Sequence, residues 1–141
     1  MIKQLLLSTA LLAASVTASA DYTLPFTFAM DSQTQLDECT VVANEPAKGT
    51  KGTWVYDSSK NAFKCNYDSS VASDDWVITP AIDFANTNKI KLSIDARKQT
   101  GNGNASFEVK LGRTADPEDM TVSVLNVAAS DLNSFFGAKN L

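Results

Sequence analysis

Hydrophobic and polar residues alternate with a period of two along much of the chain. In residues 89–97, "KIKLSIDAR", every second residue is apolar, and residues 106–112, "SFEVKLG", alternate in the same way. Because successive side chains of a strand point to opposite faces, both segments are predicted to be half-buried strands. The Gly- and Asn-rich residues 98–104 between them predict a hairpin with a mobile tip.

Short apolar runs elsewhere have the same character and are separated by Asn, Ser, Gly and Asp. The further predicted strands are 24–28, 39–43, 53–56, 62–67, 75–79 and 120–127. This spacing indicates an all-β sandwich or barrel that forms one domain, residues 21–141. The one helical segment expected is "ADPEDM", where Asp116 is predicted to cap a single turn that starts at Pro117.

The first 20 residues have the pattern of a secretory signal peptide. Lys3 provides the positive charge, an apolar stretch follows, and Ala18-Ser19-Ala20 is a small-residue cleavage site. A membrane-spanning helix is the rival interpretation, but the apolar run is shorter than the roughly 20 residues that a bilayer needs. We therefore expect an exported protein, secreted or at the cell surface, with no membrane span after cleavage.

Charge narrows the classes of partner. Cleavage after Ala20 would remove one of the 12 basic residues and leave 11 against 16 acidic ones in a chain of 121 residues. That length suffices for one domain with a core. The chain is acidic and has no basic stripe. This argues against nucleic acid and anionic lipid as partners, because both require clustered Lys or Arg. Neutral glycans, proteins and divalent cations remain suitable partners.

The two cysteines, Cys39 and Cys65, both follow the predicted cleavage site. An even number of cysteines in an exported chain favours a disulfide between them, because the compartment is oxidising. A pair of buried free thiols is the alternative.

The chain contains no histidine, which removes the usual general base of serine and cysteine hydrolases and the commonest zinc ligand. Any catalysis would rest on carboxylates. Asp74 and Asp75 are neighbours, so in a strand they point to opposite faces and cannot face one substrate together. Either would need a distant acid such as Asp31 or Glu108, and a non-catalytic protein is expected.

Tryptophan and tyrosine side chains are the candidate ligand contacts. Trp54 and Trp76 could form a stacking platform for a sugar ring, and Tyr56, which shares a strand face with Trp54, is a further candidate contact; burial in the core is the alternative for each. Trp76 shares its strand face with Ile78 and is interpreted as a core residue.

Seven blocks of the chain, taken in order, resemble the cleaved-adhesin or choice-of-anchor J module of exported Bacteroidetes proteins, which include the adhesin regions attached to gingipain proteases. The resemblance covers residues 22 to about 127. Its most specific element is "DDWVITPAIDF"; the other blocks are "LPFTFAMDS", "CTVV", "TWVYDSSKNAFKCNYDSS", "KIKLSIDAR", "SFEVKLG" and "DPEDMT".

The resemblance implies a jelly-roll β-sandwich, similar to galactose-binding-like and MAM domains, that serves in adhesion or in carbohydrate and protein binding. Trp76, Ile78 and Pro80 would be the fold signature: the first two fill the core, and proline ends strand pairing because it has no N–H to donate. The family continues with further strands, so the jelly roll is expected to be incomplete at its C-terminal side. Cys39 stands where the family often has tryptophan.

Structural calcium is a further expectation, because the family often binds it and because calcium prefers carboxylate and carbonyl oxygens. Asp31 and either Asp74 or Asp75 are the candidate ligands, and strand alternation selects Asp74 unless a bulge shifts the register. Solvated charges at strand ends are the alternative. The expected function is a binding module for glycan or host glycoprotein. A structural module that contacts neighbouring domains of a longer polypeptide is the second hypothesis.

Overall fold

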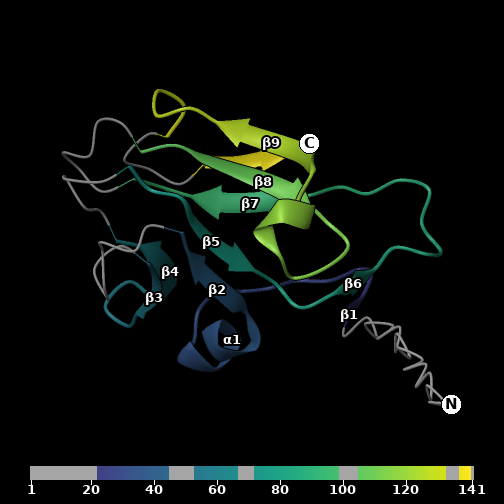
Figure 1. Cartoon of the computed structure of the whole chain (residues 1–141), viewed down its shortest axis with the longest axis horizontal. Helices are drawn as coiled ribbons and strands as arrows, with labels where there is room; N and C mark the ends of the chain where they lie inside the picture. Colours follow the sequence, from purple (N-terminus) through teal and green to yellow (C-terminus); the bar gives the residue numbers. More distant parts are fainter. Residues whose placement is uncertain (1–21, 45–52, 67–71, 99–104, 133–136, 141) are drawn as a thin grey trace, which may run out of the picture.

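The computed structural model describes residues 22–44, 53–66, 72–98, 105–132 and 137–140, and the predicted signal peptide lies outside them. The described chain is mostly β-structure (Figure 1). It has one short α-helix, α1 (Gln33–Glu38), and one 3₁₀ turn, η1 (Pro117–Asp119). The strands are β1 (Tyr22–Thr23), β2 (Thr40–Ala43), β3 (Trp54–Asp57), β4 (Ala62–Cys65), β5 (Asp75–Ile78), β6 (Ile82–Asp83), β7 (Ser93–Ala96), β8 (Phe107–Leu111), β9 (Val122–Val127) and β10 (Gly137–Asn140).

The described strands pair two by two. β2–β5, β3–β4, β7–β10 and β8–β9 are antiparallel, and β1–β6 is parallel. The predicted all-β class therefore agrees with the structure, whereas the described strands do not close into a sandwich or jelly roll. Among the described residues, β7 pairs with β10 and β8 with β9, and no ladder joins 89–97 to 106–112, where a hairpin was predicted. Most of its predicted tip lies outside the described residues.

The main core lies between β7 and the β8–β9 pair. Leu125, Val127 and Leu132 are its buried residues, and Phe107, Val109, Ile94 and Ala96 pack against them. The predicted alternation places these apolar side chains on one face of each strand, while Glu108 is exposed on the other face of β8. Strand β9 has a bulge opposite Val109 and Lys110, after which the ladder resumes.

An aromatic cluster forms a second centre of packing. Ring centroids are 4.3 Å apart for Tyr22 and Phe26, 5.9 Å for Phe26 and Phe28, and 6.0 Å for Phe28 and Phe63. These distances are typical of favourable aromatic pairs. The cluster connects the chain before α1 with β4, so residues 24–28, which were predicted to form a strand, contribute through their rings rather than through a ladder.

Helix α1 was not predicted, although its start is visible in the sequence. The Ser32 hydroxyl accepts a hydrogen bond from Gln35 N at 3.3 Å, and the Gln35 side chain accepts one from Asp31 N at 3.1 Å. This is close to a capping box, in which a serine and a glutamine three residues later satisfy each other's backbone donors. Leu36, 7 % exposed, fixes the helix against the rest of the chain.

The ladder of β2 and β5 ends at Thr40 opposite Ile78, two residues before Pro80. The next strand, β6, pairs with β1 instead. This is the arrangement expected where proline cannot donate to a ladder. The β5–β6 connection therefore transfers the chain from one strand pair to another.

The β3–β4 turn is held by Asp57, whose Oδ1 accepts hydrogen bonds from Ser59 N at 3.0 Å and from Ser59 Oγ at 2.6 Å. The hydroxyl bond is the main cause of the lowered pKa of Asp57. Asn61 closes the turn with a φ of 51° and accepts a hydrogen bond from the Tyr56 hydroxyl at 2.8 Å. Asparagine tolerates this left-handed conformation better than other residues with a Cβ atom.

Replacing Asn61 tests this conformation. We expect Asn61→Ala to lower the free energy of unfolding by about 1 to 2 kcal/mol and Asn61→Gly to lower it less, because glycine has no Cβ penalty at positive φ. Urea denaturation measures the difference, and Tyr56→Phe serves as the control for the lost hydrogen bond. Equal stability of the alanine and glycine variants would contradict the strained turn.

Candidate binding site around Trp76

The register of β2 and β5 places four side chains on one face. Val42 is the ladder partner of Trp76, and the Asn44 amide continues the pairing by donating to the Asp74 carbonyl at 3.2 Å. Directly opposed residues of an antiparallel pair lie on the same face. Val42, Asn44, Asp74 and Trp76 therefore form one surface.

Asp74 holds this surface together through both carboxylate oxygens. Oδ1 accepts a hydrogen bond from Trp76 Nε1 at 2.8 Å, and Oδ2 accepts one from Asn44 Nδ2 at 2.7 Å. Hydrogen bonds to an ionised acceptor are short and strong. The carboxylate consequently orients both the indole ring and the amide of the neighbouring strand.

Lys110 extends the arrangement to β8. Its Nζ atom lies 5.6 Å from the centre of the Trp76 ring and 2.9 Å from Glu108 Oε2. The hydrogen bond from Lys110, together with its charge and the Ser123 hydroxyl, lowers the pKa of Glu108 against a raising effect of desolvation. We refer to Asn44, Asp74, Trp76, Lys110 and Glu108 as the Trp76 strip.

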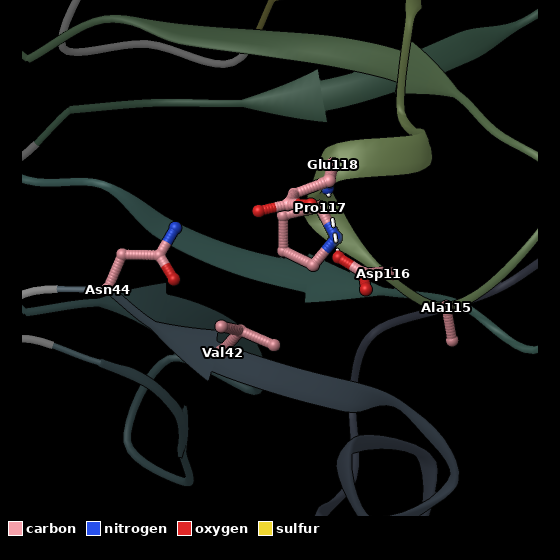
Figure 2. A pocket seen from close by; sticks show the side chains of 6 residues that line it. All are labelled: Val42, Asn44, Ala115, Asp116, Pro117 and Glu118. Carbon is pink, nitrogen blue, oxygen red and sulfur yellow. Dashed lines mark hydrogen bonds between the residues drawn. The ribbon is translucent and has the colours of Figure 1, made fainter.

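An open cleft of about 450 Å³ adjoins the strip. Figure 2 shows Val42 and Asn44 on one side and Pro117 and Glu118 of η1 on the other. The remaining lining residues are Ala115 and Asp116. The cleft therefore presents carboxylates, an amide and small apolar surfaces, a composition suited to a ligand that carries hydroxyl groups.

The η1 wall of the cleft is built by local hydrogen bonds. As predicted, Asp116 caps the turn: its Oδ1 accepts from Glu118 N at 3.0 Å, and Pro117 is the first residue. The Thr114 hydroxyl donates to the Asp119 carboxylate. Gly112, just after β8, lies against the turn so closely that a Cβ atom there would be 2.7 Å from the Asp119 carbonyl oxygen.

Gly112→Ala tests whether this contact positions the wall. The added methyl group would also meet Met120 Sδ at 2.7 Å, so the turn must shift. We expect a loss of about 1 to 3 kcal/mol in the free energy of unfolding, as overpacking produces. NMR should also show changed amide shifts at Glu118, and the neighbouring exposed Arg113→Ala is the matched control. An alanine variant with unchanged stability and shifts would contradict the role of Gly112.

The structure separates the predicted ligand contacts Trp54 and Tyr56 from this site. Both are half-buried on β3. Trp54 Nε1 donates to the Asp75 carbonyl at 3.2 Å, and the Tyr56 hydroxyl donates to Asn61. Their polar atoms therefore hold the β3–β4 hairpin against β5 and close its turn.

Trp76 and Ile78 differ in burial although they share a strand face. Ile78 is 8 % exposed and belongs to the buried residues, whereas Trp76 is half-buried. The indole N–H is bonded to the exposed Asp74, and a lysine lies over the ring, so Trp76 is at the margin of the packed region and not in a core. The structure thus places Trp76, interpreted from the sequence as a core residue, among the half-buried residues. Pro80 is half-buried.

The three predicted calcium ligands lie in different settings. Asp31 precedes α1, Asp74 belongs to the strip, and Asp75 points to the other face of β5, where its Oδ2 lies 3.7 Å from Cys65 Sγ. Within the described ranges, no three His, Cys, Asp or Glu side chains gather in a group that could hold a metal ion. Calcium binding by Asp31 with Asp74 or Asp75 stays a prediction from the sequence.

Cys39 and Cys65 are free thiols in the structure, in contrast to the predicted disulfide. Cys39 ends α1: its N–H donates to the Leu36 carbonyl at 3.0 Å, and its Sγ points back to the Gln35 carbonyl at 3.3 Å. The sequence interpretation placed Cys39 in a strand, and the helix turns its thiol to this different position. Burial, and next the charge of Glu38, raise the pKa of Cys39 to about 11.

The raised pKa predicts slow alkylation. At pH 8 the fraction of thiolate is about a hundredfold lower for a thiol with a pKa of about 11 than for one with a pKa of 9. In a Cys65→Ser variant, we expect iodoacetamide to modify Cys39 far more slowly in the folded than in the unfolded protein. Glu38→Gln should raise the rate modestly and Asp37→Asn should not. Equal rates in folded and unfolded protein, measured by mass spectrometry, would contradict the shift.

Comparison with known proteins gave no matching family model, no similar curated protein and no similar solved structure. The resemblance to the choice-of-anchor J module therefore rests on the sequence blocks alone. None of the helices in the described part of the chain has the length and hydrophobicity to cross a membrane.

Several residues of the site were not predicted. Asn44 directly follows a predicted strand, and Lys110 is an outward position in the alternation of β8, so both were placed on the correct element without a role. Pro117 and Glu118 were expected in a capped turn. Their connection to Trp76 depends on which strand pairs lie next to one another, for which the sequence carries no local signal.

Proposed function

We propose that the chain is a non-catalytic, exported binding module for carbohydrate or host glycoprotein. The observation that carries this proposal is the double hydrogen bond of Asp74, which holds an indole ring and an amide on one surface beside an open cleft. A pyranose presents C–H groups to an aromatic ring and hydroxyl groups to carboxylates and amides. The strip and the cleft together offer both kinds of contact.

The proposed role needs positioned polar groups and no reacting one. Asp74 uses both oxygens within the protein, and Asp75 lies on the other face of the strand. Lys110 makes a cation–π contact with the half-buried Trp76, so the indole ring interacts with a group from outside its own strand. Asn44 and Glu118, which are exposed, are the groups of the cleft that would meet the hydroxyls of a sugar.

Export and the finer fold belong to the same proposal. The signal peptide at residues 1–20 would export the module from the cell, and a jelly-roll sandwich of the choice-of-anchor J type is the finer fold that we propose. The described strand pairs are compatible with that architecture, since they bury apolar residues on one face of β8 and β9.

A glycan array tests the proposal with the purified full-length protein and four variants. The array carries neutral oligosaccharides and mucin-type glycans. Trp76→Phe removes the indole N–H that Asp74 orients, and the double variant Asn44→Ala with Glu118→Ala removes exposed polar groups of the cleft. Trp54→Phe and Tyr56→Phe are matched controls on β3.

We expect at least one glycan to bind, and expect both Trp76→Phe and the Asn44/Glu118 variant to weaken binding about tenfold, the effect of losing one or two hydrogen bonds. The β3 controls should keep the affinity of the native protein. Binding that is lost in Trp54→Phe but retained in Trp76→Phe would move the site to the β3–β4 hairpin, and an array without any bound glycan would contradict the sugar-binding proposal.

A structural module for contacts with other protein domains is the second candidate. It is favoured by apolar side chains that the described residues leave exposed, among them Ile90 and Val122 at 49 % and 54 %. Such residues suit a protein interface when they are contiguous.

A further inference from the structure

The core face of the β8–β9 pair continues beyond the part that β7 covers. Phe107 opposite Val127 and Val109 opposite Leu125 belong to the core. The next apolar pair on this face is Leu111 opposite Val122, and these two side chains are 38 % and 54 % exposed. Leu111 and Val122 are therefore an uncovered extension of a packed surface.

The chain before β7 lies at the same end. Figure 1 shows β7 and β8 running in opposite directions, and Ile94 and Ala96 of β7 pack on the core residues of β8 and β9. Residues that precede β7 consequently approach the end of β8. If the alternation of β7 continues back along the chain, Ile90 and Leu92 fall on the side of Ile94; Ile90 is 49 % exposed.

The backbone of residues 89–92 has no ladder partner among the described residues. The β7–β10 ladder pairs Ser93 with Asn140 and runs from there to Ala96. Yet Lys89, Ile90, Lys91 and Leu92 continue the alternation of β7. A segment with a strand pattern and unpaired backbone groups is a site where another extended chain can add.

The lysines decide the kind of partner. Lys89 and Lys91 are exposed, and the same alternation assigns them to the face opposite Ile90. A second copy of this chain that added at the same residues would place lysine against lysine, which is destabilising, whereas opposite charges across a strand pair are favourable. A strand that carries carboxylates on that face fits instead.

We propose that residues 89–92, together with Leu111 and Val122, form a docking site for an extended segment of a separate polypeptide in which apolar residues alternate with Asp or Glu. The apolar side chains would cover Ile90, Leu111 and Val122, the backbone would pair with residues 89–92, and the carboxylates would face the lysines. This site is on the other face of β8 from Glu108 and Lys110, so it is separate from the Trp76 strip.

Fluorescence anisotropy with synthetic peptides tests the site on the full-length protein. The probe is a capped eight-residue peptide of alternating valine and glutamate; the comparison peptides have lysine in place of glutamate, or N-methyl groups on alternate backbone amides. Val122→Thr and Lys91→Glu alter the docking site, and Val41→Thr, at an exposed valine on β2, is the matched control.

We expect the valine–glutamate peptide to bind and to slow hydrogen exchange at residues 89–92, with about tenfold weaker binding to Val122→Thr and to Lys91→Glu. Val41→Thr should bind like the native protein, and the lysine and N-methylated peptides should not bind. Equal binding of the glutamate and lysine peptides, equal effects of Val41→Thr and Val122→Thr, no binding at all, or a dimer in light scattering that is lost in Val122→Thr would each overturn the proposal.

Discussion

The register of the β2–β5 ladder is the constraint on which the rest of the arrangement depends. It places Val42 opposite Trp76 and Thr40 opposite Ile78, so Trp76 lies on the face of this pair that turns toward Lys110 of β8. The other face carries Asp75 toward the β3–β4 hairpin. A shift by one residue would exchange these faces and separate every contact of the site, because side chains alternate with a period of two.

In the part of the chain that the structure describes, side chains and not shared ladders connect the strand pairs. Trp54 donates to the β5 backbone, Lys110 reaches the Trp76 ring, and Lys98 donates to the Ala129 carbonyl at 2.9 Å. Exposed ion pairs and single polar contacts stabilise a fold only weakly. The main effect of these polar contacts is to orient the strand pairs relative to one another. The larger contribution to stability comes from apolar burial around Leu125, Val127 and Leu132.

The two proposed sites use the two faces of β8 in different ways. On the face with Glu108 and Lys110, charges and hydrogen bonds hold an indole ring at the side of a cleft, which suits a polar ligand of limited size. On the face with Phe107, Val109 and Leu111, the apolar surface extends beyond the part that β7 covers. Such a surface suits the binding of an extended polypeptide segment. A protein with both would hold a ligand and a partner without competition between them.

The sequence by itself determined the features that depend on near neighbours in the chain. The hydrophobic pattern predicted β2 to β5, β7 to β9 and the buried face of β8, but not β1, β6 or β10. Asp116 and Pro117 predicted the capped turn η1, whereas the serine and glutamine that start α1 were a readable signal that was missed. Only the tertiary structure decided that β7 pairs with β10, that Trp76 lies at a margin beside Lys110, and that the Cys39 thiol faces its own helix. The physical reason is that alternation specifies which side of a strand is apolar, whereas the choice of ladder partner and of covering residues depends on contacts between segments far apart in the sequence.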